Sequence, residues 1–230
     1  MKTSTYKFGI QSVWINLIGI ITSGLIFPGL TAIWFPQPEW QGPSLFITHF
    51  HPVQTATYFC GFLLVIGSLL SFTALFYEAK DEQKVWAQSA LLINLLFSGI
   101  VVINYIIQTT YVPFLAKNNP PETAGLLPCF SMSNPGSFAW ALEMYGWGGI
   151  GLSYILMATV FKDGRYSKPL KKLFTLNGIC SIGAAFMTSV DMKWIFSVAG
   201  FISLVVWNSL VLVIDILLIK YFRFRLIQHN

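Results

Sequence analysis

The sequence predicts an all-α integral membrane protein, a bundle of six transmembrane helices with both termini in the cytoplasm. Composition is the first observation behind this prediction. Hydrophobic residues make up 55% of the 230 residues and charged residues only 10%, whereas soluble domains carry roughly 25% charged residues. Long apolar segments are the second observation, because a backbone in lipid must satisfy its own hydrogen bonds within helices. The third observation is the one-sided distribution of basic residues.

Six apolar segments can each supply the roughly 20 residues that cross a hydrocarbon core. The first follows a short basic stretch, is too long for the apolar core of a secretion signal, and should bend at Pro28. Charged residues around Lys80 separate the second and third segments, and a basic loop around Arg165 separates the fourth and fifth. A tight turn at Asp191 precedes the sixth. The expected spans are 10–35, 54–77, 85–110, 138–161, 173–190 and 194–219.

Basic residues predict the orientation of these spans. Of the 14 lysines and arginines, only Lys117 and Lys193 fall on the side opposite the termini. The positive-inside rule therefore places both termini in the cytoplasm. The net charge of +5 then reflects topology and contact with anionic lipid headgroups. No basic stripe interleaved with aromatic residues is present, so we expect membrane lipids, and no nucleic acid, as partners.

The chain is expected to form a single transmembrane domain over residues 1–230, because loops 36–53 and 111–137 are too short and proline-rich to bury a core. Six spans would allow two inverted halves, as in many transporters, but the halves show no sequence similarity. The cysteines leave two alternatives open. Cys60 and Cys129 can be imagined as a disulfide, or all three cysteines, with Cys180, are unpaired apolar side chains.

Glu143 is the strongest candidate for a functional residue. A carboxylate inside a bilayer costs several kcal/mol unless it is paired, hydrated or protonated, and so it marks a site by default. Trp140 and Trp147 lie at i−3 and i+4 from Glu143, on one face of the predicted helix. The predicted topology places this face in the outer half of the membrane. If the protein is an enzyme, Glu143 is the expected catalytic acid, with His51 or Asp191 as the second group.

A second polar stripe lies at the same predicted depth, on the third span. Asn104, Gln108 and Tyr111 follow at i, i+4 and i+7. We expect these side chains, with others near the outer surface, to line an outward-facing, mostly apolar ligand pocket. The predicted ligand-binding residues are His49, His51, Gln54, Asn104, Gln108, Tyr111, Trp140, Glu143 and Trp147, with Asp191 nearby.

Each of these residues also has a purely structural interpretation. The tryptophans fit an interfacial aromatic belt. The two amides can simply bond neighbouring helices. The two histidines can be ordinary loop residues, and Glu143 can be a structural acid that is protonated or hydrogen-bonded to Asn104 or Gln108. The sequence leaves these alternatives open.

No metal or cofactor is predicted. His49, His51 and Glu143 are three potential ligands, but histidines one residue apart point to opposite sides of an extended segment, and no other ligand spacing supports a metal centre. Cys129 and Met132 have no further soft ligand that would support copper. The glycines that follow Glu143 fit close helix packing better than a nucleotide loop.

Asp215 is a second acid within an apolar segment. It lies five residues before Lys220, so its carboxylate is expected to reach that ammonium or water by snorkelling. Asn208 lies one heptad earlier on the same face. A proton or ion route would exist if Asn208 and Asp215 met the Glu143 pocket from the cytoplasmic side.

Part of the chain resembles a group of small polytopic bacterial inner-membrane proteins without assigned activity. The motif is Asn104-Tyr105-x-x-Gln108, then Asn134-Pro135, then Ala141-Leu142-Glu143-x-x-Gly146. It covers under a third of the chain. The resemblance implies a bacterial inner membrane and supplies no catalytic or transport residues.

Three functional classes are compatible with these features. The first is binding or transport of a small apolar or amphiphilic, lipid-like molecule, with Glu143 receiving an amine or hydroxyl. The second is an intramembrane acid/base enzyme, such as an isomerase or cyclase of isoprenoid-like substrates. The third is an accessory or permease subunit that works with a transporter partner or as a homo-oligomer. We favour the first, because amides and aromatic rings orient ligands better than they move protons.

Overall fold

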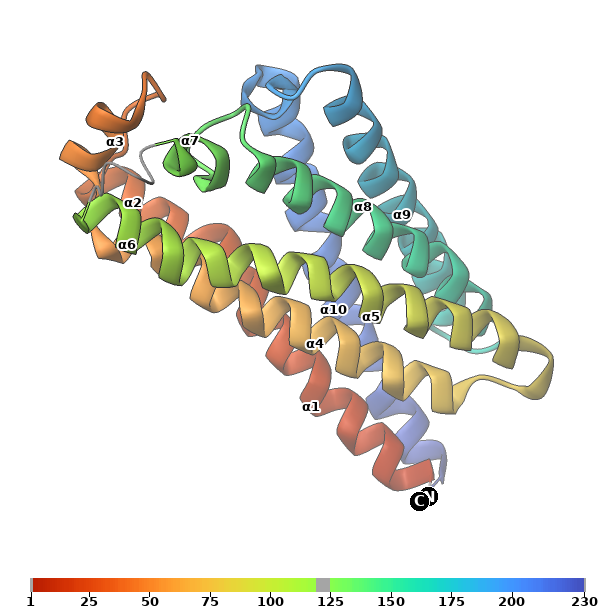
Figure 1. Cartoon of the computed structure of the whole chain (residues 1–230). Helices are drawn as coiled ribbons and strands as arrows, with labels where there is room; N and C mark the ends of the chain where they lie inside the picture. The colour runs from red at the N-terminus through yellow and green to blue at the C-terminus, as the bar shows by residue number, and fades with distance from the viewer. Residues whose placement is uncertain (1, 119–124, 230) are drawn as a thin grey trace.

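The computed structural model describes residues 2–118 and 125–229, and all regular secondary structure in those ranges is helical (Figure 1). The all-α prediction is therefore confirmed. In chain order the elements are α1 (Lys2–Ile21), η1 (Thr22–Ile26), α2 (Phe27–Trp34), α3 (Pro43–His49), η2 (Pro52–Thr55), α4 (Ala56–Glu78), η3 (Asp81–Gln83), α5 (Lys84–Ile106), η4 (Ile107–Tyr111), α6 (Val112–Asn118), α7 (Leu126–Phe130), α8 (Phe138–Met157), η6 (Ala158–Val160), α9 (Ser167–Val190), η7 (Trp194–Phe196) and α10 (Val198–His229).

Five continuous helical segments of the described chain are long and apolar enough to cross a membrane. The predicted fourth span, 138–161, forms the long helix α8 followed by η6 but is not among the five. Glu143 and the tryptophans, tyrosines and glycines of α8 interrupt its strongly apolar residues, and so α8 does not meet the hydropathy that the five segments share. The five are Lys2–Trp34, Pro52–Glu78, Asp81–Asn118, Ser167–Val190 and Val198–His229.

The long helices extend beyond the apolar segments that predicted them. The first begins at Lys2 rather than residue 10, and α10 continues to His229 rather than ending at residue 219. Lysine, arginine and glutamine interrupt an apolar run, but they are good helix formers. The basic residues near the two termini therefore lie on helical turns that continue the first and last apolar segments.

Two prolines explain the irregular turns in the first and third long helices. The π turns η1 and η4 each end two residues before a proline, Pro28 and Pro113. Proline lacks an N–H and its ring clashes with the carbonyl four residues earlier, so the helix ladder changes register there. Hydroxyls bond the carbonyls of the preceding turn, as when Thr109 donates to the Tyr105 carbonyl at 2.7 Å.

Helix α1 packs between α4 and α10, while α8 packs against both α5 and α9. Glycines allow the closest approaches. A Cβ placed on Gly19 would lie 2.3 Å from the Leu64 backbone nitrogen, and one on Gly67 would lie 2.3 Å from the Asn16 backbone nitrogen. Backbones this close exclude any side chain at these two positions, which is the common basis of helix association in lipid.

The two ends of the bundle differ. Both chain termini lie together at one end, here named the terminal end, which also carries the loops 79–83 and 161–166 (Figure 1). The opposite end carries α2, α3, α6, α7 and η7. A separate apolar cluster around Phe46, Val112, Leu115 and Leu127 holds α3, α6 and α7 together there.

Three ion pairs join described residues, and all three lie at the terminal end. Lys80 pairs with Asp163 at 3.0 Å and Lys162 pairs with Glu82 at 2.7 Å, so the two loops are linked twice. The third pair joins Arg225 of α10 to Glu78 of α4. The charges that the sequence places near the membrane surface therefore also hold helix ends together.

Acidification should weaken the link between the two terminal-end loops. The hydrogen bond from Lys162, followed by its charge, lowers the pKa of the Glu82 carboxyl below its usual value. A lowered folded-state pKa stabilises the folded protein above the unfolded-state pKa, and this stabilisation is lost as pH falls through the folded value. The melting temperature of Glu82→Gln should therefore lie slightly below that of the unaltered protein near pH 7. The difference should vanish near pH 3, and a difference independent of pH would contradict this account.

Candidate functional site

Glu143 accepts three side-chain hydrogen bonds from two helices. The Asn104 amide donates to Oε2 at 3.0 Å, and the Tyr105 hydroxyl donates to Oε1 at 2.9 Å. The Trp147 indole also donates to Oε1, at 2.9 Å. The carboxylate thus has most of its acceptor capacity satisfied by neutral donors.

Local structure explains why these groups meet. Helix α8 begins at Ser137, whose hydroxyl accepts from the Trp140 backbone nitrogen at 3.3 Å, so Glu143 lies in the second helical turn. Trp147 follows one turn later on the same face. Opposite, a Cβ on Gly146 would lie 2.5 Å from Val101 of α5. This close approach of α8 and α5 brings Asn104 and Tyr105 to the carboxylate.

Gln108 and Trp140 anchor the loop that follows α7. The Gln108 amide donates to the Phe130 carbonyl at 2.7 Å and accepts from the Met132 backbone nitrogen at 3.1 Å. The Trp140 indole donates to the Met132 carbonyl at 2.5 Å. The Gln108 amide also donates to the side-chain Oδ1 of Asn104 at 3.3 Å. These two residues therefore position the Glu143 network without touching the carboxylate themselves.

The charge on Glu143 has no cationic counterpart among the described residues, since all their ion pairs lie at the terminal end. Its three neighbours present N–H or O–H groups to its oxygens. Such donors stabilise a carboxylate, and the Tyr105 hydroxyl is the one of the three that can also accept a proton from a neutral Glu143. The carboxyl group is thus held by three donors and has no cationic partner among the described residues.

Aromatic rings frame this carboxylate. Trp147 packs edge-on against Trp207 of α10, with ring centroids 5.0 Å apart, and the Trp207 indole donates to Ser181 at 3.0 Å. On the other side, Tyr105 contacts Tyr58 at 5.8 Å and Phe62 at 5.9 Å between centroids. Faces of such rings attract cations and add to the pull of the carboxylate.

The part of α10 that precedes Trp207, toward the opposite end, is not packed into the bundle. Asn208 lies against Gly24 of the first helix, and from there to the terminal end α10 is packed. Every residue from Phe201 to Val206 is exposed, with Phe201 at 63% and Val205 at 50%. Six consecutive helical residues cover all faces of a helix. No other helix in the described part of the chain therefore covers this apolar stretch, and the ribbons splay there (Figure 1).

A small cavity lies beside the Glu143 network at the opposite end. Its volume is about 40 Å³, and Gln54, Tyr58 and Gln108 are among its lining residues. A water molecule occupies about 30 Å³ in the liquid. The cavity therefore suits water, and a larger ligand would have to approach Glu143 from another direction.

The two histidines and Gln54 have structural partners. His51 and Gln54 form a reciprocal cap at the start of η2, and the His51 ring stacks on Phe35 with centroids 4.0 Å apart. The Gln54 amide donates to the Phe35 carbonyl at 2.9 Å. His49 is exposed and contacts the Leu45 carbonyl of its own helix at 3.0 Å. None of these contacts reaches Glu143.

Asp191 and Tyr111 also lie apart from the carboxylate. Asp191 is exposed and caps the turn between α9 and η7 by accepting from the Lys193 backbone nitrogen at 2.9 Å. The Tyr111 ring packs on Phe114 and Phe130 in the apolar cluster of α3, α6 and α7. The π turn η4 explains this, because its extra residue rotates Tyr111 away from the face of Asn104.

Sequence reasoning missed Tyr105 and Trp207 as members of the site. Tyr105 follows Asn104 directly, but an aromatic residue near a predicted membrane surface is ordinarily assigned to the interfacial belt. Trp207 lies on a helix distant in sequence, and only the packing of α8, α9 and α10 brings it to Trp147. The adjacency of Tyr105 to Asn104 was the one available signal.

Asp215 does not behave as the sequence suggested. It is 1% exposed and bonds Asn16 of α1, and no ion pair of the described residues joins it to Lys220. Three cysteines, Cys60, Cys129 and Cys180, are free. Within the described residues no group of three or more His, Cys, Asp or Glu side chains is placed to hold a metal ion.

No protein-family model, curated protein or solved structure matches this chain.

Proposed function

We propose that this protein binds, and carries across the membrane, a small amphiphilic molecule whose protonated amine pairs with Glu143. In this proposal α8 also crosses the membrane, as the fourth of six spans, both termini face the cytoplasm, and the opposite end faces outward. The membrane is a bacterial inner membrane, as the resemblance of the Asn104–Gln108 and Glu143 motifs implies. Glu143 then lies in the outer half of the bilayer.

The unpaired carboxylate is the observation that carries this proposal. Asn104, Tyr105 and Trp147 hold Glu143 in place by donating hydrogen bonds to its two oxygens. A negative charge of low hydration needs a cation, and no lysine or arginine of the described chain supplies one by an ion pair. An ammonium group can accept this role, with additional attraction from the Trp147 face.

The uncovered part of α10 offers a surface on which the apolar part of the ligand can bind. Trp147 contacts Trp207, so the face of α8 that carries Glu143 looks toward α10 at the point where α10 leaves the bundle. An apolar chain can lie along Phe201–Val206 while the amine reaches the half-buried carboxylate. The ligand would enter sideways from the lipid.

The enzyme alternative receives less support from this geometry. A general acid must hold its proton, but the three neighbours of Glu143 all donate hydrogen bonds to it. The second groups considered, His51 and Asp191, are engaged in caps elsewhere. Tyr105 contacts Glu143 and is the one neighbour that can relay a proton. Formation of a product from an isoprenoid substrate would support the enzyme hypothesis.

Ligand selectivity tests the proposal directly. The purified protein in lipid nanodiscs would be titrated with dodecylamine, dodecanol and dodecanoate, which share a chain length and differ in headgroup. Thermal stability and tryptophan fluorescence would both be followed, because Trp147 and Trp207 border the site. At 100 times its Kd the amine should stabilise the protein by about 2.7 kcal/mol, and the alcohol and carboxylate by much less. Equal stabilisation by all three compounds would refute amine recognition.

A further inference from the structure

Asp215 of α10 is the second carboxylate enclosed by the bundle. Its side chain is 1% exposed, and the Asn16 amide of α1 donates to Oδ1 at 2.9 Å and to Oδ2 at 3.0 Å. None of the ion pairs in the described chain includes it. A carboxylate enclosed by helices without a cation must be neutralised, and the smallest agent that can do so is a proton.

A polar network surrounds this acid inside an otherwise apolar core. Tyr154 of α8 interacts with both Asp215 and Ser68 of α4. Asn94 of α5 donates to Ser68 and to Ser153 of α8, each at 3.3 Å. Helices α1, α4, α5, α8 and α10 all contribute to this network. Polar groups joined across five helices mark a site rather than a single interhelical contact.

Asn16 can serve Asp215 in both protonation states. Its Nδ2 donates to the carboxylate, while its Oδ1 is buried and has no hydrogen-bond partner. If the amide turns over, Oδ1 can accept the hydroxyl of a protonated Asp215. One residue thus supplies a donor for the ionised acid and an acceptor for the neutral one. The pair can gain or lose a proton with only a side-chain rotation.

The other titratable groups around Asp215 do not neutralise it. Among the described residues, Tyr154 of α8 is the ionisable side chain that interacts with it. On α4 the nearest acid is Glu78, which is paired with Arg225 at the terminal end. The lysines of α9 and of the same helix are exposed at the terminal end: Lys168, Lys171, Lys172 and Lys220.

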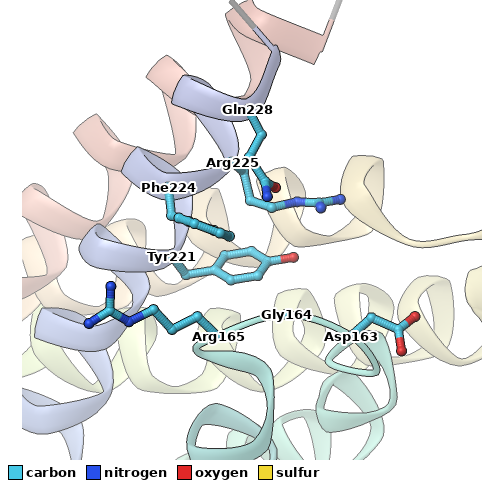
Figure 2. Close-up of a pocket in the computed structure, with 7 residues that line it drawn as sticks. All are labelled: Asp163, Gly164, Arg165, Tyr221, Phe224, Arg225 and Gln228. Atoms are coloured by element: carbon cyan, nitrogen blue, oxygen red, sulfur yellow. The ribbon is translucent and has the colours of Figure 1, made fainter.

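A cavity lies at the terminal end, beside the last turns of α10. It has a volume of about 250 Å³ and is lined by Arg165, Tyr221, Arg225 and neighbouring residues, with the Tyr221 ring at its centre (Figure 2). The buried Tyr221 donates to Glu78 at 3.3 Å. Tyr221 lies six residues beyond Asp215, about 9 Å along the helix. The residue that lines the cavity is therefore about two helical turns from the acid along α10.

We propose that Asp215 is a proton-binding site that exchanges its proton with the cytoplasm through the cavity at Tyr221. The site is separate from Glu143, since the fully buried Val101 lies between the two polar networks on α5. The inference therefore stands whether or not an amine binds at Glu143. If the protein is a transporter, Asp215 is the group through which a proton gradient would act.

Infrared spectroscopy of the protein in nanodiscs tests this proposal. A protonated carboxyl has a C=O stretching band distinct from the bands of carboxylates and amides. The unaltered protein at neutral pH should show such a band, Asp215→Asn should lack it, and the matched variant Glu143→Gln should retain it. Transfer to D₂O should shift the band, and Tyr221→Phe should slow that shift severalfold because it removes the hydroxyl at the inner wall of the cavity.

Several outcomes would overturn the proposal. If the spectra of Asp215→Asn and of the unaltered protein are identical from about pH 5 to about pH 9, Asp215 holds no proton in this pH range. Loss of the band when NaCl replaces choline chloride would identify a sodium site instead. An unchanged exchange rate in Tyr221→Phe would refute the route through the cavity. If Asp215→Asn does not fold, Asp215→Glu keeps the carboxyl and assigns the band through its altered frequency.

Discussion

Replacing Glu143 by glutamine should remove the affinity of the protein for amphiphilic amines while leaving the fold intact. Glutamine has nearly the same shape and still accepts hydrogen bonds from two of the three donors, but it carries no charge. Removing one partner of a poorly hydrated charge pair costs roughly 2 kcal/mol or more, which corresponds to about a 30-fold weaker Kd. Isothermal titration or fluorescence titration with dodecylamine measures this loss.

Glu39 offers a matched control for this variant. It is also an acid near the opposite end of the bundle, but it is exposed and lies in the segment between α2 and α3. Glu39→Gln removes the same formal charge at a similar level and should leave amine affinity unchanged. Equal losses in both variants would show that a diffuse surface charge, rather than Glu143 itself, attracts the amine.

Replacing Gly67 by alanine should lower the stability of the protein markedly. The new Cβ would lie 2.3 Å from the Asn16 backbone nitrogen and 2.6 Å from its Cα, so α1 and α4 would have to move apart. Overpacking of this kind typically costs about 1–3 kcal/mol. The displacement would also shift Asn16, which holds Asp215. Thermal unfolding in mild detergent, followed by circular dichroism, measures the effect.

Gly99→Ala is the control for this substitution. Gly99 lies within α5, and no atom outside its own helix lies within 4 Å of the Cβ position. Alanine is the better helix former by roughly 0.5–1 kcal/mol in solution, so Gly99→Ala should be neutral or stabilising. Gly67→Ala should thus lower the stability of the protein, whereas Gly99→Ala should not. A Gly67→Ala protein as stable as Gly99→Ala would show that α1 and α4 do not approach as closely as described.

The helical fold could be predicted from the sequence because its signals are local. Apolar segments of about 20 residues predict helices wherever they occur. Pro28 likewise marks the irregular turn in the first helix. Helix ends were less predictable, since the basic residues near Lys2 and His229 interrupt an apolar run without ending a helix.

The candidate site was predictable only where one helix carries its members. Trp147 and Glu143 share a face at helical spacing, and the hydrogen bond between them follows from that spacing. Tyr111 does not follow the regular helical spacing from Asn104, because the π turn η4 adds a residue there. This turn depends on Pro113, two residues later. A regular period cannot anticipate such a change of register.

Contacts between distant helices lie beyond what a single sequence shows. Asp215 has a lysine five residues away, and local reasoning pairs the two, yet its partner is Asn16 at the other end of the chain. Packing of α1 against α10 decides this pairing. The caps formed by His51 and Asp191 are similar, since polar residues next to helix ends serve structure as readily as chemistry.

An experimental structure of the protein with dodecylamine in a lipid nanodisc tests the central claim most directly. The account predicts density for the amine nitrogen within hydrogen-bonding distance of a Glu143 oxygen, with Trp147 beside it and the alkyl chain along Phe201–Val206. The same density should be absent from Glu143→Gln. An amine bound elsewhere, or a Glu143 carboxylate paired with a cationic side chain of the protein, would contradict the account.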